Sequence, residues 1–404
     1  FAIYFLAVAV IYFTARLLGV RPVLAATAAG FALFIGRSFF DVRPAAFSNL
    51  LVAVFILILV LTSYRNALYI WLIVPVIIFW SNVHGGYLYA FIVLVPFLGW
   101  HLIMHLPRRW LVAVYSILTW LILYGLTHQF LVRIVEMKND YAPQLRAVMP
   151  EHGAMLVFLL ILAAGSLAVA FYRRIGETAV IVLHALATGL VFLLLVFQYA
   201  VDVPNFMNDR LDNLFQAQIS GGLWTFVGMS ALAVAIAAVV LSRRKGEIRV
   251  LDWRTLLHTV GAGAVAFVAM VLFNPFHLTN LTHTFIISVS EHAERWRDVH
   301  EWHRALDWSN PVGTAIPFLT MYLLAWLALS VWTVLTVRST FAQRPSKKRA
   351  PKTEEPTWPP MDIIFLIIGA LTVYMAIRSR RFIPVAGFAA CPVIALLVQR
   401  RSEE

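Results

Sequence analysis

Long apolar runs recur along the whole chain, separated by short charged connections, and this pattern limits the possible folds most strongly. Hydrophobic residues make up 61% of the 404 residues and charged residues only 13%, so a water-soluble fold would expose large apolar patches. A helix that crosses a bilayer core of about 30 Å needs about 20 apolar residues. The runs are continuous and lack the alternation of barrel strands. The sequence therefore predicts an integral membrane protein built from helices.

The expected fold is an all-α, polytopic transmembrane bundle of about 11–13 helices with interfacial helices on the extracytoplasmic side. We expect helices near residues 1–14, 22–36, 46–62, 67–81, 87–106, 110–127, 154–172, 178–200, 220–241, 255–273, 314–337, 361–377 and 382–399. The chain divides into a transmembrane core at 1–337, a cytoplasmic linker at 338–360 and a C-terminal helix pair at 361–404. Cys391 is the single cysteine, which excludes a disulfide within the chain.

The positive-inside rule gives the expected orientation. With the loop that contains Arg16 and Arg21 placed in the cytoplasm, the formal net charge of +12 falls on the cytoplasmic side. This excess indicates orientation and attraction to anionic membrane lipids, not nucleic-acid binding, because the basic stretch at 338–356 is too short and polar to be a folded domain. The longer connections lie on the opposite side, at 36–44, 81–86, 128–153, 201–219 and 274–313. We therefore expect the functional face to be extracytoplasmic.

The stretch "GRSFFDVRP" at 36–44 places Asp41 between Arg37 and Arg43. Two guanidinium groups beside a carboxylate at the membrane boundary suit a phosphate, while the carboxylate meets a hydroxyl or a metal. The alternative is that Asp41 only neutralises its neighbours.

The stretch "WSNVHGG" at 80–86 places Asn82 and His84 at a helix end, directly before Gly85 and Gly86. An imidazole there could bind a phosphate, position a hydroxyl or pass a proton. The glycines permit left-handed or tightly turned backbone and close approach of a ligand. The alternative is a helix C-cap, in which glycine ends the helix and the histidine favours its negative pole.

Residues 290–307 have the pattern of an amphipathic helix at the membrane surface, with opposite charges at i,i+4 spacing. The alternative is that charged side chains of this segment face a cavity and bind an anionic donor. The candidates for that role are Arg295, Arg297, His300 and Glu301. A zinc site is disfavoured because His300 and His303 lack an evident third ligand. The metal ligands are unknown, and a divalent cation such as Mg or Mn stays an open expectation.

The stretch "RSRRFIP" at 378–384 places three arginines in a very short outer turn, against the positive-inside rule. We expect an anionic partner, a lipid phosphate or pyrophosphate, to offset this charge, with Arg378 and Arg381 as its ligands. Anchoring at the headgroups is the alternative.

Five segments occur in an order that is familiar: "RPAAFSNLL", "WSNVHGG", "FNPFHLTNLTHTF", "VHEWHRALDWSNPVG" and "RSRRFIPVAGFAACPVIA". In this order the chain resembles bacterial polytopic proteins grouped with the family-39-like GT-C glycosyltransferases, among them planctomycete-type membrane proteins. The resemblance implies a GT-C-like fold in a bacterial inner membrane. It also implies an enzyme that moves a sugar from a polyprenyl-phosphate-linked donor to a glycan, lipid or protein acceptor outside the cytoplasm.

In that family an acid in the first outer loop usually acts as catalytic base or metal ligand, and a second acid can lie in the next loop. The chain opens on Phe1 without an initiator methionine, so we expect a helix and an outer loop upstream of it. Asp41 then takes the place of the second acid, and the principal acid precedes this sequence. Asp41 and His84 are our expected catalytic residues, with the arginines and Asn82 as substrate ligands. A WWDYG-type signature is absent from the sequence, which disfavours an oligosaccharyltransferase.

Two other classes stay open. An O-antigen-type polysaccharide polymerase or ligase would also use outer arginines and histidines on lipid-linked glycans. A transporter or scaffold would carry out no chemistry; a transporter would show internal repeats and ionisable residues near mid-membrane, and neither is clear in this sequence.

Overall fold

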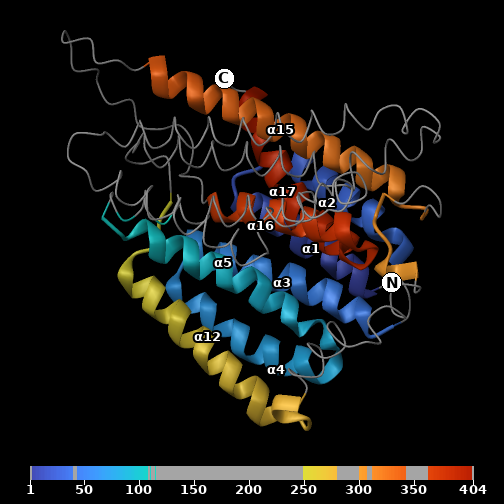
Figure 1. The fold of residues 1–404 in the computed structure, drawn as a ribbon, viewed down its shortest axis with the longest axis vertical. Coiled ribbons are helices and arrows are strands. Elements are labelled where there is room, and N and C mark those ends of the chain that lie inside the picture. Colours follow the sequence, from blue (N-terminus) through green and yellow to red (C-terminus); the bar gives the residue numbers. More distant parts are fainter. Residues whose placement is uncertain are drawn as a thin grey trace, which may run out of the picture. The chain divides into compact units, whose positions relative to one another are not determined.

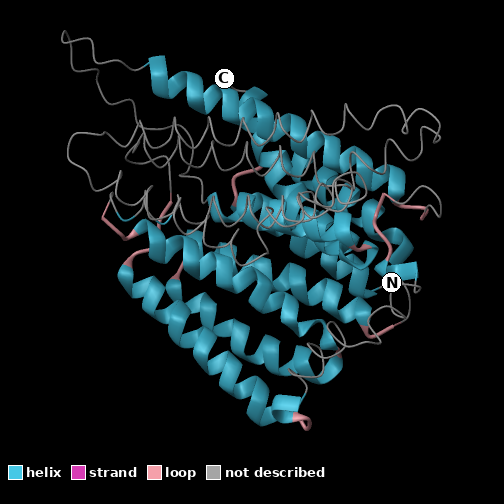
Figure 2. Ribbon diagram, in the orientation of Figure 1, coloured by secondary structure: helices cyan, strands magenta, loops and turns pink. Residues whose placement is uncertain are grey.

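The computed structural model describes residues 2–39, 43–107, 110, 114, 249–279, 300–306, 312–342 and 363–402. Within these residues the regular structure is entirely helical (Figure 2). The α-helices are α1 (Ala2–Leu17), α2 (Pro22–Gly36), α3 (Ala45–Tyr64), α4 (Ile73–Val83), α5 (Leu88–Met104), α12 (Trp253–Phe273), α15 (Ala315–Ala342), α16 (Ile363–Arg378) and α17 (Ile383–Ser402). Short 3-10 turns join several of them, namely η1 (Arg37–Phe39), η2 (Ala67–Leu72), η3 (Gly85–Tyr87), η6 (His300–Trp302) and η7 (Arg380–Phe382).

Each expected helix that falls within the described residues is present, with ends within a few residues of those predicted. The expected helix at 67–81 begins as the 3-10 turn η2 and becomes α-helical only at Ile73. Pro75 explains this start, because proline has no N–H to bond the carbonyl four residues earlier and its ring clashes with that carbonyl. Apart from the helical positions Trp110 and Val114, the expected helices between 110 and 241 lie outside the described residues, as do the loops 128–153 and 201–219.

Among the described residues, six helical segments are long and apolar enough to cross a membrane. They are Pro22–Phe39, Ala45–Tyr64, Gly85–Met104, Trp253–Phe273, Ala315–Trp332 and Arg380–Gln399. Three shorter apolar helices accompany them at Ala2–Leu17, Ala67–Val83 and Ile363–Arg378. The chain is therefore a multi-pass helical membrane protein.

The chain forms two compact units, Phe1–Leu102 with Ser242–Glu404, and Ile103–Leu241. The first unit holds almost all of the described residues. In this unit the last two helices of the chain pack with the first ones: α17 lies against both α2 and α16 (Figure 1). At Gly387 an added Cβ would lie 3.2 Å from the carbonyl oxygen of Ala32, so small residues permit close approach of the two helices. The side chain of Gln399 accepts a hydrogen bond from the backbone N–H of Arg21 at 2.6 Å, which makes α17 antiparallel to α2.

The first unit has two ends, which α3 separates. This helix contains 20 residues and is therefore about 30 Å long. We call the end where α3 begins the Arg43 end, and the end where it finishes the Arg65 end. The positive-inside rule predicts that the Arg43 end is extracytoplasmic and the Arg65 end cytoplasmic.

Candidate functional site

Four residues singled out from the sequence come together at the Arg43 end: Arg43, His84, Glu301 and Arg381. We call them the Arg43 cluster. Nη1 of Arg43 donates to Oε1 of Glu301 at 2.8 Å, an ion pair between residues 258 positions apart. Both Arg381 and Glu301 lie close enough to His84 to influence its pKa. The four residues come from four separate segments, and each of them stands at or beside a helix end.

His84 occupies the junction between two helical segments. It is the C-cap of α4, with its backbone N–H bonded to the carbonyl of Trp80, and also the N-cap of η3. Its Nδ1 accepts a hydrogen bond from the backbone N–H of Gly86 at 3.0 Å. The side chain of Asn66 accepts a similar hydrogen bond from Leu68 at the start of η2. The expected capping role of His84 is therefore present in the structure, in a form that also begins the next helical turn.

A relay of hydrogen bonds, which begins at a buried indole, fixes the imidazole ring. The indole N–H of Trp80 donates to the hydroxyl oxygen of Ser48 at 2.7 Å, and this oxygen lies 2.7 Å from Nδ1 of His84. Since Nδ1 already accepts from Gly86, the Ser48 hydroxyl must be the donor to Nδ1. The hydrogen-bonding pattern thus assigns the ring proton to Nε2.

The electrostatic environment favours the neutral form of His84. Burial of the ring lowers its pKa below the ordinary value of 6.5, the positive charge of Arg381 lowers it further, and Glu301 opposes the shift. At neutral pH, His84 therefore presents an Nε2–H group, which can donate a hydrogen bond to a ligand oxygen. The arrangement favours this donor role over the role of general base.

Aromatic rings surround Arg381. Its guanidinium lies 4.5 Å from the ring centroid of Trp302 and 5.8 Å from that of Phe382, distances at which a cation is attracted to an aromatic face. Tyr89 packs against Phe382 with centroids 5.2 Å apart, and its hydroxyl is close enough to interact with Arg381. Half-buried beside these rings, Arg381 has no carboxylate partner at salt-bridge distance among the described residues.

Arg380 attaches the segment of Glu301 to the start of α17. Its side chain is fully buried, its backbone N–H donates to the carbonyl of His303 at 2.8 Å and its Nε donates to the carbonyl of Arg304 at 2.9 Å. The hydroxyl of Ser379 donates to the carbonyl of Glu301 at 3.1 Å. These bonds fix the position of Glu301 relative to Arg381.

The described part of the expected amphipathic helix is not a continuous helix. Residues 300–302 form the 3-10 turn η6, and 303–304 lead without helix into a turn at 305–306, where Ala305 and Leu306 are buried. The backbone bonds with Arg380 explain this course, because they hold the chain against the bundle. Residues 290–299, including Arg295 and Arg297, lie outside the described residues.

The other expected site residues are placed differently. Arg37 donates to the carbonyl of Gly313 at 2.7 Å and thereby ties the end of α2 to the segment before α15. Asn82 donates to Ile78 at 2.8 Å and to Phe273 at 3.2 Å, bridging α4 and α12. Arg378 is exposed at the end of α16, and His300 lies in η6. Asp41 is outside the described residues.

The structure adds residues that the sequence did not single out: Ser48, Trp80, Tyr89, Trp302 and Arg380. Ser48 lies within "RPAAFSNLL" and Trp80 opens "WSNVHGG", so both stood inside quoted segments, but their side-chain contacts cross between α3 and α4. Among the described residues, no group of three or more His, Cys, Asp or Glu side chains could hold a metal ion.

Comparisons with protein-family models, with curated proteins and with solved structures gave no match.

Proposed function

We propose that this chain is a GT-C-type membrane glycosyltransferase, which moves a sugar from a polyprenyl-phosphate-linked donor to an extracytoplasmic acceptor. The observation that carries the proposal is the convergence of Arg43, His84 and Arg381 at helix ends of one bundle. The apolar tail of such a donor stays in the bilayer, and its phosphate lies at the boundary. A cationic site at helix ends, beside apolar helical walls, suits that division.

In the proposed reaction, the acceptor hydroxyl attacks the anomeric carbon while the bond from that carbon to the phosphate oxygen breaks. The electron pair of this bond leaves with the carrier phosphate, and the hydroxyl proton passes to a base. Arg381 and Arg43 stabilise the charge that develops on the departing phosphate. The Nε2–H of His84 donates to one of its oxygens, and Asp41 is the candidate base.

The ion pair between Arg43 and Glu301 suggests a role for Glu301 before the donor binds. A carboxylate and a phosphate oxygen offer the same acceptor chemistry to a guanidinium. In the absence of donor, Glu301 holds the guanidinium of Arg43 in place. When the donor binds, its phosphate replaces Glu301 as the partner of that guanidinium. The exposure of both side chains, 63% for Arg43 and 43% for Glu301, keeps the cost of this exchange low.

The proposal is tested with purified full-length chain, a panel of polyprenyl-phosphate sugars and an envelope extract as acceptor, with release of polyprenyl phosphate as the readout. The informative variant is His84→Asn. An Asn side chain presents its oxygen near the place of Nδ1, as Asn66 does at the start of η2, but it has no group at the place of Nε2. We expect an unchanged melting temperature and a loss of release of about tenfold or more.

Release that is equal in wild type and in the His84→Asn and Arg381→Gln variants would remove the Arg43 cluster from the reaction. No release with any donor in the panel, from folded natural protein in which the expected upstream acid is present, would contradict the proposed activity. The mass of the transferred unit separates a single sugar from the long glycan that a polymerase or ligase would move.

A further inference from the structure

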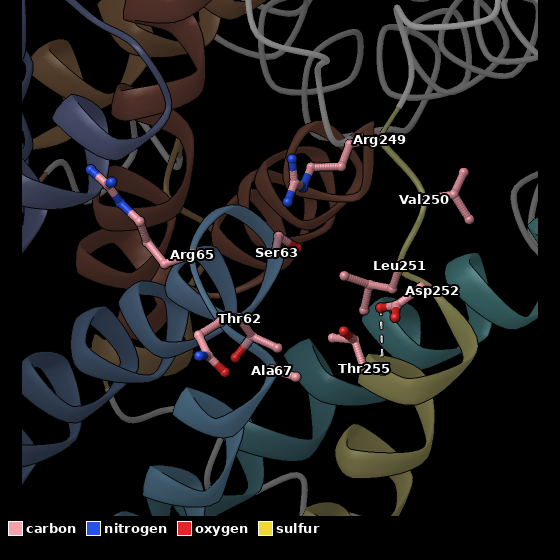
Figure 3. Close-up of a pocket in the computed structure, with 10 residues that line it drawn as sticks. Thr62, Ser63, Arg65, Ala67, Arg249, Val250, Leu251, Asp252 and Thr255 are labelled. Atoms are coloured by element: carbon pink, nitrogen blue, oxygen red, sulfur yellow. Dashed lines mark hydrogen bonds between the residues drawn. The ribbon is translucent and has the colours of Figure 1, made fainter.

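A second polar site lies at the Arg65 end of the first unit, about one helix length from the Arg43 cluster. It is a pocket of about 430 Å³ between the end of α3 and the extended segment that precedes α12 (Figure 3). Its polar lining includes Ser63, Arg65, Asn66, Arg249, Asp252 and Thr255. Neither the expected glycosyl transfer nor the Arg43 cluster makes use of this pocket.

Two arginines stand at the pocket, and Figure 3 shows that the Arg249 side chain reaches over it, whereas the Arg65 side chain points away from the other lining residues. Arg249 lies with its guanidinium 4.9 Å from the ring centroid of Tyr64, and Arg65 is exposed at the C-cap of α3. Neither arginine has a carboxylate partner at salt-bridge distance among the described residues. Cation attraction to the ring orients Arg249 without neutralising it, so its charge remains available to a ligand in the pocket, and Arg65 adds positive potential beside it.

The acidic residue that lines the pocket caps the helix that follows it. Asp252 is the N-cap of α12, and its Oδ1 accepts the backbone N–H of Thr255 at 3.3 Å. Hydrogen bonding with Thr255 lowers the pKa of Asp252 below its ordinary value, so it is ionised at neutral pH. The positive pole of the helix offsets this charge, and Asp252 therefore does not cancel the two arginines.

A neutral donor completes the lining. The oxygen of the Asn66 side chain accepts from Leu68 at 2.9 Å, which leaves its NH2 group as a donor on the other side of the amide. The positive-inside rule explains why arginines lie on the cytoplasmic side, but it does not explain why they stand beside the same pocket. Here the guanidinium of Arg249 lies at one hollow together with hydroxyl and amide groups, and Arg65 stands beside it. Guanidinium, hydroxyl and amide groups are donors that a phosphate takes.

We propose that this pocket binds a phosphate group, carried either by the headgroup of an anionic phospholipid or by a soluble phosphate ester. The polar lining suits the phosphate and not an acyl chain. Its position at the end of a membrane-spanning helix places it at headgroup depth, where basic pockets meet anionic lipid.

The test measures lipid binding to the full-length chain in a neutral detergent, by native mass spectrometry with phosphatidylglycerol and with phosphatidylcholine. Wild type retains phosphatidylglycerol in preference to phosphatidylcholine. The double variant Arg65→Gln with Arg249→Gln loses phosphatidylglycerol affinity by about tenfold or more.

Arg254→Gln is the matched control, because it removes one positive charge from the first turn of α12 without altering the pocket lining. Its affinity stays within about twofold of wild type, since surface charges contribute little individually.

Unchanged affinity in the double variant, or an equal loss in Arg254→Gln, overturns the proposal in favour of general surface attraction. If the double variant does not fold, Arg249→Gln alone decides, because it removes the guanidinium that reaches over the pocket; it must weaken binding. Competition by glycerol 3-phosphate assigns the site to soluble esters, and binding of phosphatidylglycerol that glycerol 3-phosphate cannot displace assigns it to lipid. Binding of neither contradicts the proposal. The outcome leaves the glycosyltransferase proposal untouched, because these variants lie at the opposite end of α3.

Discussion

The hydroxyl oxygen of Ser48 and Nδ1 of His84 lie 2.7 Å apart, joining the fourth residue of α3 to the C-cap of α4. The same oxygen accepts from the indole of Trp80, which is fully buried. One buried hydroxyl therefore satisfies a buried indole and also sets the tautomer of His84. The donor on Nε2, which we propose for phosphate recognition, depends on this relay.

Replacing Ser48 should destabilise the fold. Ser48→Ala leaves the buried indole N–H of Trp80 without its acceptor, and an unsatisfied buried donor costs about 1–3 kcal/mol. We expect that decrease in the free energy of unfolding in detergent. Thr14→Val is the matched control, since it removes a buried hydroxyl that donates to the carbonyl of Val10 within its own helix. Equal effects of the two substitutions would contradict the relay.

The two adjacent glycines should respond differently to alanine. A Cβ at Gly86 would lie 2.5 Å from Oγ of Ser48 and 2.9 Å from Nδ1 of His84, whereas a Cβ at Gly85 has nothing within 4 Å. Gly86→Ala should therefore displace the relay and cost about 1–3 kcal/mol of stability. Gly85→Ala should change it by no more than about 0.5 kcal/mol. Thermal unfolding of both variants checks this, and a tolerated Gly86→Ala would show that the relay can be rearranged.

The glycine pair illustrates what the sequence could and could not predict. The pattern indicated a helix end at His84, and it is there. It also suggested left-handed backbone, yet neither glycine has a positive φ. Gly86 is needed because Ser48 approaches it from a different helix, and no local pattern contains that contact. Helix ranges were predictable because membrane thickness imposes a length on each apolar run.

The arginine turn shows the same limit. The sequence pointed to an anionic site at "RSRRFIP" but gave no means of ranking three neighbouring arginines. In the structure Arg380 is buried against carbonyls, Arg381 lies against aromatic rings and Arg378 is exposed. The short turn η7 and the carbonyls of residues 303–304 decide which side chain points inward, and those carbonyls lie more than 70 residues away in the chain.

The ion pair of Arg43 and Glu301 should matter for binding and not for stability. Exposed pairs contribute about 0–1 kcal/mol, so Arg43→Gln and Glu301→Gln should each change the free energy of unfolding by less than about 1 kcal/mol. A double-mutant cycle measures this coupling. Arg43→Gln should nevertheless weaken binding of polyprenyl phosphate to the full-length chain. Unchanged binding would exclude Arg43 from the phosphate site, and a large loss of stability would contradict the exposed character of the pair.

Stability should depend on pH through His84. Its pKa is lowered in the folded chain, so the unfolded chain takes up the proton first as the pH falls. The contribution of neutral His84 is complete above its unfolded pKa near 6.5 and is lost progressively as the pH falls toward the folded pKa. Between about pH 7 and pH 5, the melting temperature of wild type should fall more steeply than that of His84→Asn. Parallel curves for the two proteins would contradict the lowered pKa.

Cysteine labelling tests the predicted sidedness of the two sites. Gly85 is exposed at the Arg43 end, and Arg254 is exposed at the start of α12, beside the pocket of the Arg65 end. Cys391 is buried, so the unsubstituted chain should label weakly and serves as the control.

In intact cells, a membrane-impermeant maleimide should label Gly85→Cys, and it should label Arg254→Cys only after the membrane is opened. The positive-inside rule requires this order, because the basic connections at the Arg65 end belong in the cytoplasm. Labelling of both positions from the same side would contradict the helix arrangement, and the reverse order would place the Arg43 cluster in the cytoplasm, where an extracytoplasmic acceptor could not reach it.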